Sequence, residues 1–296
     1  MNEDCSNVLQ HYAGTVTLKQ STQQSGNPQV MHIWIHWTML MLLPLLGAAL
    51  LFNGVCAFNQ TVFTLATAER QVRFCGAAYC TDPSFKNGKV QEWTCNACKS
   101  SPHVEAKVFN GETADANGFV GYEKLADEII VAFSGTDAVS EKNWIEDVDF
   151  PLIDFPHCQG CKVHNGFYIT YLSISKEIKS LISGFLALHP TAKITVTGHS
   201  LGAALATIAI ADLSSDKTFL PSMATNGQFL FGSPRVGNKP FADWYSSKAP
   251  LTFRVVHNRD PVSLVPFQKM GFHHVPYEVS DTCPSTKKLI YRHFFS

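Results

Sequence analysis

The sequence lacks an excess of charge of either sign. Its 23 basic and 24 acidic residues leave a formal net charge of −1 over 296 residues, and the two kinds are interspersed along the chain. Proteins that bind the phosphates of nucleic acids usually carry a basic stripe or patch, so nucleic acid is not an expected partner. The composition, 45% hydrophobic and 16% charged, is that of an ordinary globular protein with a sizeable core.

The sequence also lacks an apolar run long enough for a confident membrane-spanning helix, which needs about 20 residues. The longest candidate, Met39 to Phe52, is short and contains a proline. Small residues follow it at positions 54–57, as they do before a cleavage site. We therefore expect residues 31–57 to be a signal peptide or an uncleaved anchor, and either would export the chain that follows. The protein is then expected to be secreted.

No Pro/Gly/Ser-rich linker or internal repeat divides the chain after this segment. Residues 1–30 are polar with little hydrophobic periodicity and are expected to be a disordered or untranslated leader. Residues 58–296 are expected to form one domain. Within it, apolar runs typical of buried strands alternate with segments of helical periodicity, which predicts an α/β fold with a mostly parallel sheet flanked by helices. The expected strands are 128–133, 193–197, 227–231 and 251–256, and the expected helices are 167–188 and 201–213.

The strongest chemical signal is the sequence Gly198-His199-Ser200-Leu201-Gly202. It fits the pattern G-x-S-x-G and lies between a predicted strand and a predicted helix, which is the context of a nucleophile elbow. The glycines suit a tight turn with unusual dihedral angles, and the helix N-terminus directs free N–H groups towards the site. Ser200 is therefore the candidate nucleophile.

The chain resembles the fungal-type class 3 lipases, which are triacylglycerol lipase-like serine hydrolases of the α/β-hydrolase fold. The resemblance runs over most of residues 70–296 and rests on several stretches in the same order as in the family. Besides the elbow these are VAFSGT at 131–136, NWI at 143–145, VHNGF at 163–167, FGSPRVGN at 231–238 and NRDPV at 258–262.

The resemblance implies a Ser-His-Asp triad in which Asp260 is the acid that orients the histidine. Three histidines follow Asp260 in the order that the family requires. His293 matches the catalytic histidine near the C-terminus, and His274 matches a non-catalytic histidine of a Gly-aromatic-x-His stretch. We expect His293 to be the base, with His274 as the alternative. His273 is interpreted as a partly exposed neighbour.

The resemblance also assigns an oxyanion hole and a lid. The oxyanion donors would be the backbone N–H groups of Leu201 and Thr136, with the Thr136 hydroxyl as a further donor. Residues 137–147 occupy the position of the family's lid, a short amphipathic helix over the nucleophile. Its apolar side would be formed by Val139, Trp144 and Ile145. The alternative is a fixed surface helix, as in related esterases that act on soluble esters.

Nine cysteines bear on the compartment and on metal binding. The C-x-x-C pairs Cys95/Cys98 and Cys158/Cys161 are compatible with a zinc site, with a redox motif or with disulfides. The resemblance implies a disulfide around each short loop, and another from Cys80 to Cys283. No metal and no organic cofactor is expected.

Together these features predict a secreted monomeric hydrolase that cleaves lipid esters, triacylglycerol above all, at an oil–water or membrane interface. The alternatives are a phospholipase A1, a feruloyl-type esterase, or a lipid-binding homologue that lacks the chemistry. Fold resemblance cannot choose among them, because acyl-chain and headgroup preference depend on pocket shape.

Overall fold

The computed structural model describes residues 63–81, 89–111, 116–135, 151–257, 260–280 and the backbone of 290–292. Several predicted features lie outside these ranges: the leader, the signal or anchor segment, Thr136, the lid, Cys283 and His293. In the described part of the chain, no helix is both long and apolar enough to span a bilayer.

The centre of the molecule is an eight-stranded sheet in the order β1-β2-β3-β6-β7-β9-β11-β12. Strands β3, β6, β7, β9 and β11 run parallel, whereas β1, β2 and β12 pair antiparallel at the two edges. The predicted mostly parallel α/β sheet is therefore confirmed. The strands are β1 (Val104–Asn110), β2 (Asn117–Glu123), β3 (Glu128–Phe133), β6 (Lys193–His199), β7 (Gln228–Phe231), β9 (Thr252–Val256), β11 (Glu278–Ser280) and β12 (Ile290–Arg292).

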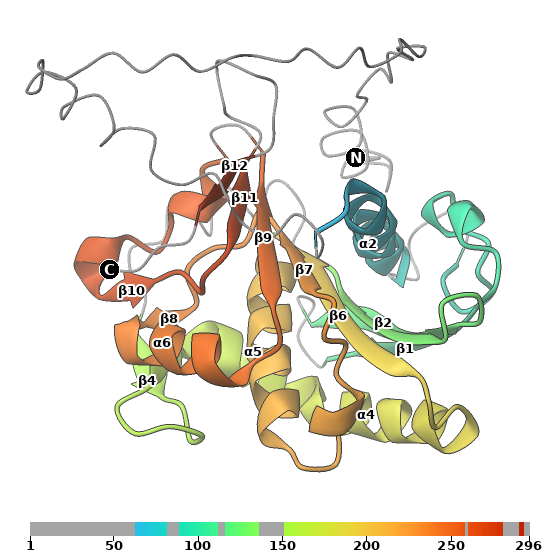
Figure 1. Cartoon of the computed structure of the whole chain (residues 1–296), viewed down its shortest axis with the longest axis horizontal. Helices are drawn as coiled ribbons and strands as arrows, with labels where there is room; N and C mark the ends of the chain where they lie inside the picture. The colour runs from blue at the N-terminus through green and yellow to red at the C-terminus, as the bar shows by residue number, and fades with distance from the viewer. Residues whose placement is uncertain are drawn as a thin grey trace, which may run out of the picture.

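Helices cover both faces of this sheet (Figure 1). Helix α2 (Leu65–Ala78) packs on one face, and α4 (Asn165–Leu188) and α5 (Leu201–Ser215) pack on the other. All six residues of β3 are buried, as expected for a strand covered on both sides. Helix α5 is rich in alanine and almost entirely buried, which lets its backbone approach the sheet closely.

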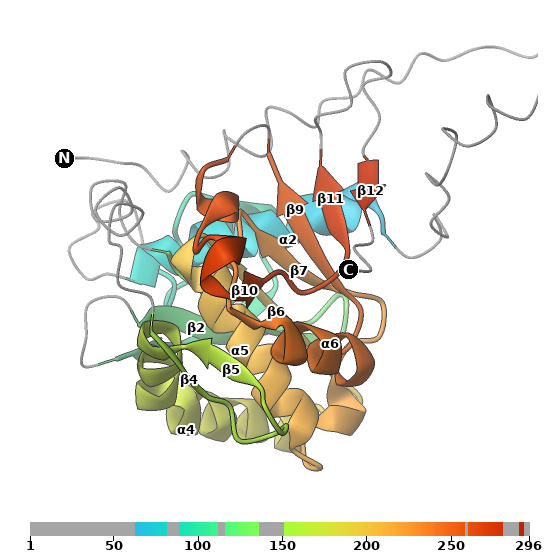
Figure 2. The same cartoon turned by 90° about the vertical axis from the view of Figure 1, so that its left-hand side faces the viewer.

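A smaller sheet lies beside the main one, in the order β10-β8-β5-β4 (Figure 2). Its strands are only two or three residues long: β4 (Leu152–Asp154), β5 (Lys162–His164), β8 (Gly237–Asn238) and β10 (Phe272–His273). Helix α6 (Lys239–Lys248) follows β8 directly. Because β8 follows β7 and β10 follows β9, this sheet brings the chain segments after these two main strands together.

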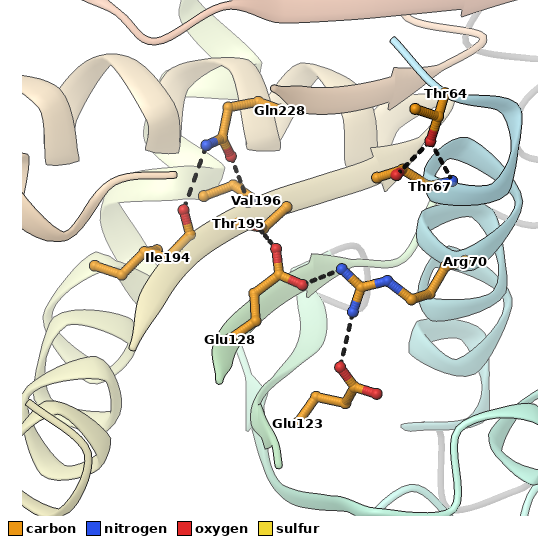
Figure 3. Close-up of polar contacts among 9 residues, drawn as sticks. All are labelled: Thr64, Thr67, Arg70, Glu123, Glu128, Ile194, Thr195, Val196 and Gln228. Carbon is orange, nitrogen blue, oxygen red and sulfur yellow. Dashed lines mark hydrogen bonds and ion pairs between the residues drawn. The ribbon is translucent and has the colours of Figure 1, made fainter. Parts of the chain in front are cut away.

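A charged network ties α2 to the main sheet (Figure 3). Arg70 Nη1 donates to Glu123 Oε2 at 2.8 Å, and its Nη2 pairs with Glu128. The second oxygen of Glu128 accepts a hydrogen bond from the Thr195 hydroxyl on β6. Both carboxylates are buried while Arg70 is only partly exposed. One guanidinium therefore joins the helix to two strands, and a third strand enters through Thr195.

The two short disulfides implied by the resemblance are present, Cys95–Cys98 and Cys158–Cys161. Cys80 is also disulfide-bonded; its expected partner, Cys283, is outside the described residues. Cys75 is a buried free thiol. Its sulfur lies 3.1 Å from the Thr197 hydroxyl, and burial raises the pKa of the thiol to about 12.

Candidate active site

Ser200 lies at the carboxyl end of β6, between the strand and α5, as the sequence predicts. Its backbone adopts φ 54° and ψ −124°, a conformation that L-residues rarely adopt and that costs about 1–3 kcal/mol. Its amide donates to the Phe231 carbonyl at 3.0 Å, which fixes the turn against β7. The turn therefore has the strained geometry expected of a nucleophile elbow, and the neighbouring strand holds it.

Two glycines make this elbow possible because there is no room for a side chain at either one. A Cβ at Gly198 would collide with the backbone of Gly202. A Cβ at Gly202 would lie 2.5 Å from the Phe133 carbonyl oxygen and 2.6 Å from the Ser134 carbonyl oxygen. The pattern G-x-S-x-G is thus explained by close backbone contacts, first within the elbow and then with the end of β3.

The Ser200 side chain makes no structural hydrogen bond to the described residues. The residue is 1% exposed, and its Oγ has no hydrogen-bond partner among the described residues. Leu201 is the first residue of α5, and the first N–H groups of a helix have no acceptor within it. A carbonyl oxygen beside Ser200 would therefore meet a free backbone donor and the positive end of a 15-residue helix.

The chain after β3 approaches Ser200 from the other side. Ser134 is anchored to the Asn117 carbonyl, through its amide at 2.9 Å and its hydroxyl at 3.0 Å. A Cβ at Gly135 would lie 2.7 Å from the His199 carbonyl oxygen and 3.2 Å from the Ser200 Cβ. The described backbone therefore reaches Ser200 one residue before Thr136, the candidate for the second oxyanion donor. Sequence reasoning did not single out Gly135.

Asp260 lies at the same edge of the sheet as Ser200. Strands β6, β7 and β9 are adjacent and parallel, so their carboxyl ends meet at one edge. Asp260 follows β9 and is half-buried. Its Oδ1 accepts from the Val262 amide at 2.9 Å, and its carbonyl accepts from the Ser263 hydroxyl at 2.8 Å. The local turn thus orients this carboxylate.

His274 is engaged in structural contacts. Its Nε2 lies 2.8 Å from the Ser263 carbonyl oxygen, which requires the proton to be on Nε2. Its Nδ1 is buried without a hydrogen-bond partner in the described structure. Burial, reinforced by Arg254 and Arg235, holds the pKa of His274 well below its usual value. The pKa of His273 is also lowered, first by burial and then by Lys239 and Arg235.

Two further histidines, His164 and His199, have structural partners. His164 caps α4 by accepting from the Phe167 amide at 3.2 Å. The Nδ1 of His199, directly before Ser200, lies 2.8 Å from the Tyr79 hydroxyl. Tyr79 follows α2 and was not predicted, because 120 residues separate the pair in sequence.

Comparisons with known proteins agree with this geometry. The family model for lipase (class 3) matches residues 130–270. A secreted mono- and diacylglycerol lipase 1 of Fusarium solani is 32% identical over 223 residues, which are 75% of this chain and 58% of that protein. The chain spans about half the length of the curated relatives it matches.

Solved structures give the same family. Lipase II from Rhizopus niveus is 30% identical with a TM-score of 0.68, covering 80% of this chain and 86% of its own. A triacylglycerol lipase whose catalytic centre is formed by a serine protease triad is 26% identical with a TM-score of 0.67, covering 79% of this chain and 85% of its own. The chain belongs to the class 3 lipase family.

Proposed function

We propose that the protein hydrolyses carboxylic esters of lipids, triacylglycerol foremost, through the triad Ser200, His293 and Asp260. The observation that carries the proposal is the elbow. A buried serine without a structural hydrogen bond to the described residues lies in a strained turn at the start of a buried helix. Such strain persists only where the surrounding structure imposes it, and it is typical of catalytic positions.

The reaction has two steps. Ser200 Oγ attacks the ester carbonyl carbon while His293 removes its proton, and the oxyanion accepts hydrogen bonds from the N–H groups of Leu201 and Thr136. The C–O bond then breaks, and the alcohol leaves with the proton from His293. Water, deprotonated by the same histidine, cleaves the acyl-enzyme to release the acid and restore Ser200. Asp260 orients His293 and stabilises its charged form throughout.

The choice of His293 over His274 is supported by the contacts of His274. Its Nε2 donates a hydrogen bond to the Ser263 carbonyl, and its lowered pKa makes the imidazole a weak base. A general base works best when its pKa lies near the working pH. His274 is therefore a structural residue in this proposal, and it holds the chain that follows Asp260.

The substrate class is supported by the relatives, which are lipases and include a mono- and diacylglycerol lipase and a triacylglycerol lipase. We propose further that residues 137–147, which lie outside the described residues, act as the family's lid, with Val139, Trp144 and Ile145 on its apolar side. Exposing that side to water costs about 25 cal/mol per Å², so the lid opens where lipid replaces water. The protein acts outside the cell as a monomer. Secretion is supported by the disulfides.

The test is hydrolysis of emulsified triacylglycerol and of p-nitrophenyl butyrate by the full chain, made under oxidising conditions. Ser200→Ala and His293→Ala are expected to lose at least about 10³-fold in kcat. The folded fraction of His274→Ala is expected to keep its kcat. Ser183→Ala, an exposed serine on α4, is the matched control. A folded chain that hydrolyses neither ester would contradict the proposal and favour a lipid-binding homologue.

Measuring the rate as triacylglycerol passes its solubility limit tests the lid separately. A sharp rise is expected at that limit. A rate that follows the concentration smoothly through it would indicate a fixed helix in place of a mobile lid.

A further inference from the structure

The segment of residues 261–271 joins β9 to β10 and presents two large apolar side chains to solvent. Leu264 is 55% exposed and Phe267 is 49% exposed. Between and beside them, Val262 and Val265 point into the molecule and are buried. The exposed pair therefore lies on the outer side of a loop whose inner side belongs to the core.

This loop is held in place by hydrogen bonds to its backbone. The amide of Arg235 donates to the Val265 carbonyl at 2.8 Å, and its Nη1 donates to the carbonyls of Leu264 and Pro266. His274 satisfies one more carbonyl of the loop. Arg235, after β7, and His274, after β10, thus hold the loop backbone through hydrogen bonds. Leu264 and Phe267 are therefore exposed on a well-anchored segment.

A basic side chain lies next to the apolar pair. Residues 261–271 contain one basic residue, Lys269, and no acidic residue. The Lys269 Nζ lies 5.4 Å from the centre of the Phe267 ring. A lysine beside an exposed aromatic ring suits a lipid surface, because the ring enters the apolar layer while the ammonium stays among the headgroups. An anionic headgroup would complement it.

The loop lies at the same edge of the sheet as Ser200. It follows β9, Arg235 follows β7 and Ser200 follows β6, and these three strands are adjacent and parallel. Figure 2 shows the chain after β9 returning to β10 at the end of the sheet where α5 begins. Two other exposed leucines lie at the opposite edge: Leu125 precedes β3 and Leu188 precedes β6.

We propose that Leu264, Phe267 and Lys269 form a docking surface for an anionic lipid surface, which holds the chain with the Ser200 edge towards the lipid. This deepens the proposed function and rests on it for its purpose. The docking surface is a fixed part of the described structure, and it binds lipid whether or not a lid has moved.

The test measures partition of the full chain onto large unilamellar vesicles, by sedimentation, in a Ser200→Ala background so that hydrolysis plays no part. One vesicle type is phosphatidylcholine alone, and the other contains phosphatidylglycerol as well. The variants are Leu264→Ser/Phe267→Ser, the single change Lys269→Gln, and the matched control Leu125→Ser/Leu188→Ser. Near-ultraviolet circular dichroism verifies the folding of each.

The Leu264→Ser/Phe267→Ser chain is expected to bind both vesicle types at least about tenfold more weakly than its parent, because burying such side chains usually contributes that much. The control is expected to bind like its parent. Lys269→Gln is expected to lose about fivefold on anionic vesicles only, the usual effect of one basic side chain near such a surface.

Equal partition of the two double variants would overturn the proposal. So would a parent chain that ignores both vesicle types, and in that case loss of self-association in the Leu264→Ser/Phe267→Ser chain would identify a second copy as the occupant. Because the readout is binding without catalysis, the docking proposal and the proposed hydrolase activity can fail separately. If the chain with Ser200 restored is inactive but still binds vesicles through this surface, only the proposed hydrolase activity is contradicted.

Discussion

Substitution of Gly135 tests whether the packing at the end of β3 fixes the geometry of the Ser200 turn. A Cβ at this position would lie 2.7 Å from the His199 carbonyl oxygen and 3.2 Å from the Ser200 Cβ, and closer still to the Tyr79 hydroxyl. The Tyr79 side chain can rotate away, but the His199 carbonyl is backbone of the elbow. Gly135→Ala therefore pushes directly on the turn that holds Ser200.

Two magnitudes follow. Inserting a methyl group into such a tight site costs about 1–3 kcal/mol of folding free energy. If the strain is relieved by moving the elbow instead, a displacement of about 1 Å lowers the catalytic rate about 100-fold. Gly135→Ala is expected to show one loss or both. Adding Tyr79→Phe removes one of the colliding atoms, so the double variant is expected to recover part of the loss.

The assay is kcat/KM on p-nitrophenyl butyrate together with the midpoint of thermal unfolding. Gly184→Ala is the control, because a Cβ at that exposed position within α4 meets nothing within 4 Å. It should keep full activity and gain about 0.5–1 kcal/mol, as replacing a helical glycine usually does. A Gly135→Ala chain with parental kcat/KM and unchanged unfolding midpoint would refute the packing argument.

Two further predictions concern charge. Arg70→Met leaves Glu123 and Glu128 buried without their cation, so the free energy of unfolding measured in urea should fall by about 3 kcal/mol. This is the low end of the range for buried ion pairs, because Arg70 is partly exposed. A change below about 0.5 kcal/mol would show that the network contributes little. His274 has a lowered pKa, so the unfolded chain binds its proton first, and stability should decline as pH falls below about 6.5 by up to about 1.4 kcal/mol per unit. His274→Gln should flatten that decline, and an unchanged slope would contradict the shift.

The central sheet could be predicted because its parallel strands are apolar along most of their length. Glu128–Phe133 and Lys193–His199 are buried on both faces, so their sequences stand out from the amphipathic helices between them. Helix α2 was not predicted, because charged and polar residues such as Arg70 and Gln71 keep its overall hydrophobicity low, although most of the side that it buries is apolar. The two- and three-residue strands of the small sheet are too short to show any period.

The residues of the candidate site likewise differ in whether a local sequence pattern reveals them. Ser200 could be predicted because the glycines and the strand–turn–helix context are local in sequence. Asp260 required a family resemblance, since an Asp-Pro turn alone carries little information. Gly135 and Tyr79 could not be found, because their importance comes from atoms of His199 and Ser200 that only the folded chain brings near them.

The burial of α5 has a consequence for how the protein can change. Thirteen of its fifteen residues are buried, most of them small, and Ser200 directly precedes its first turn. Interiors packed this densely tolerate little change in volume. New substrate preferences should therefore arise by substitution in the loops after β3, β7 and β9, while the α5 sequence stays fixed. A mutational library that spares α5 and diversifies those loops would keep more folded members than one spread evenly over the chain.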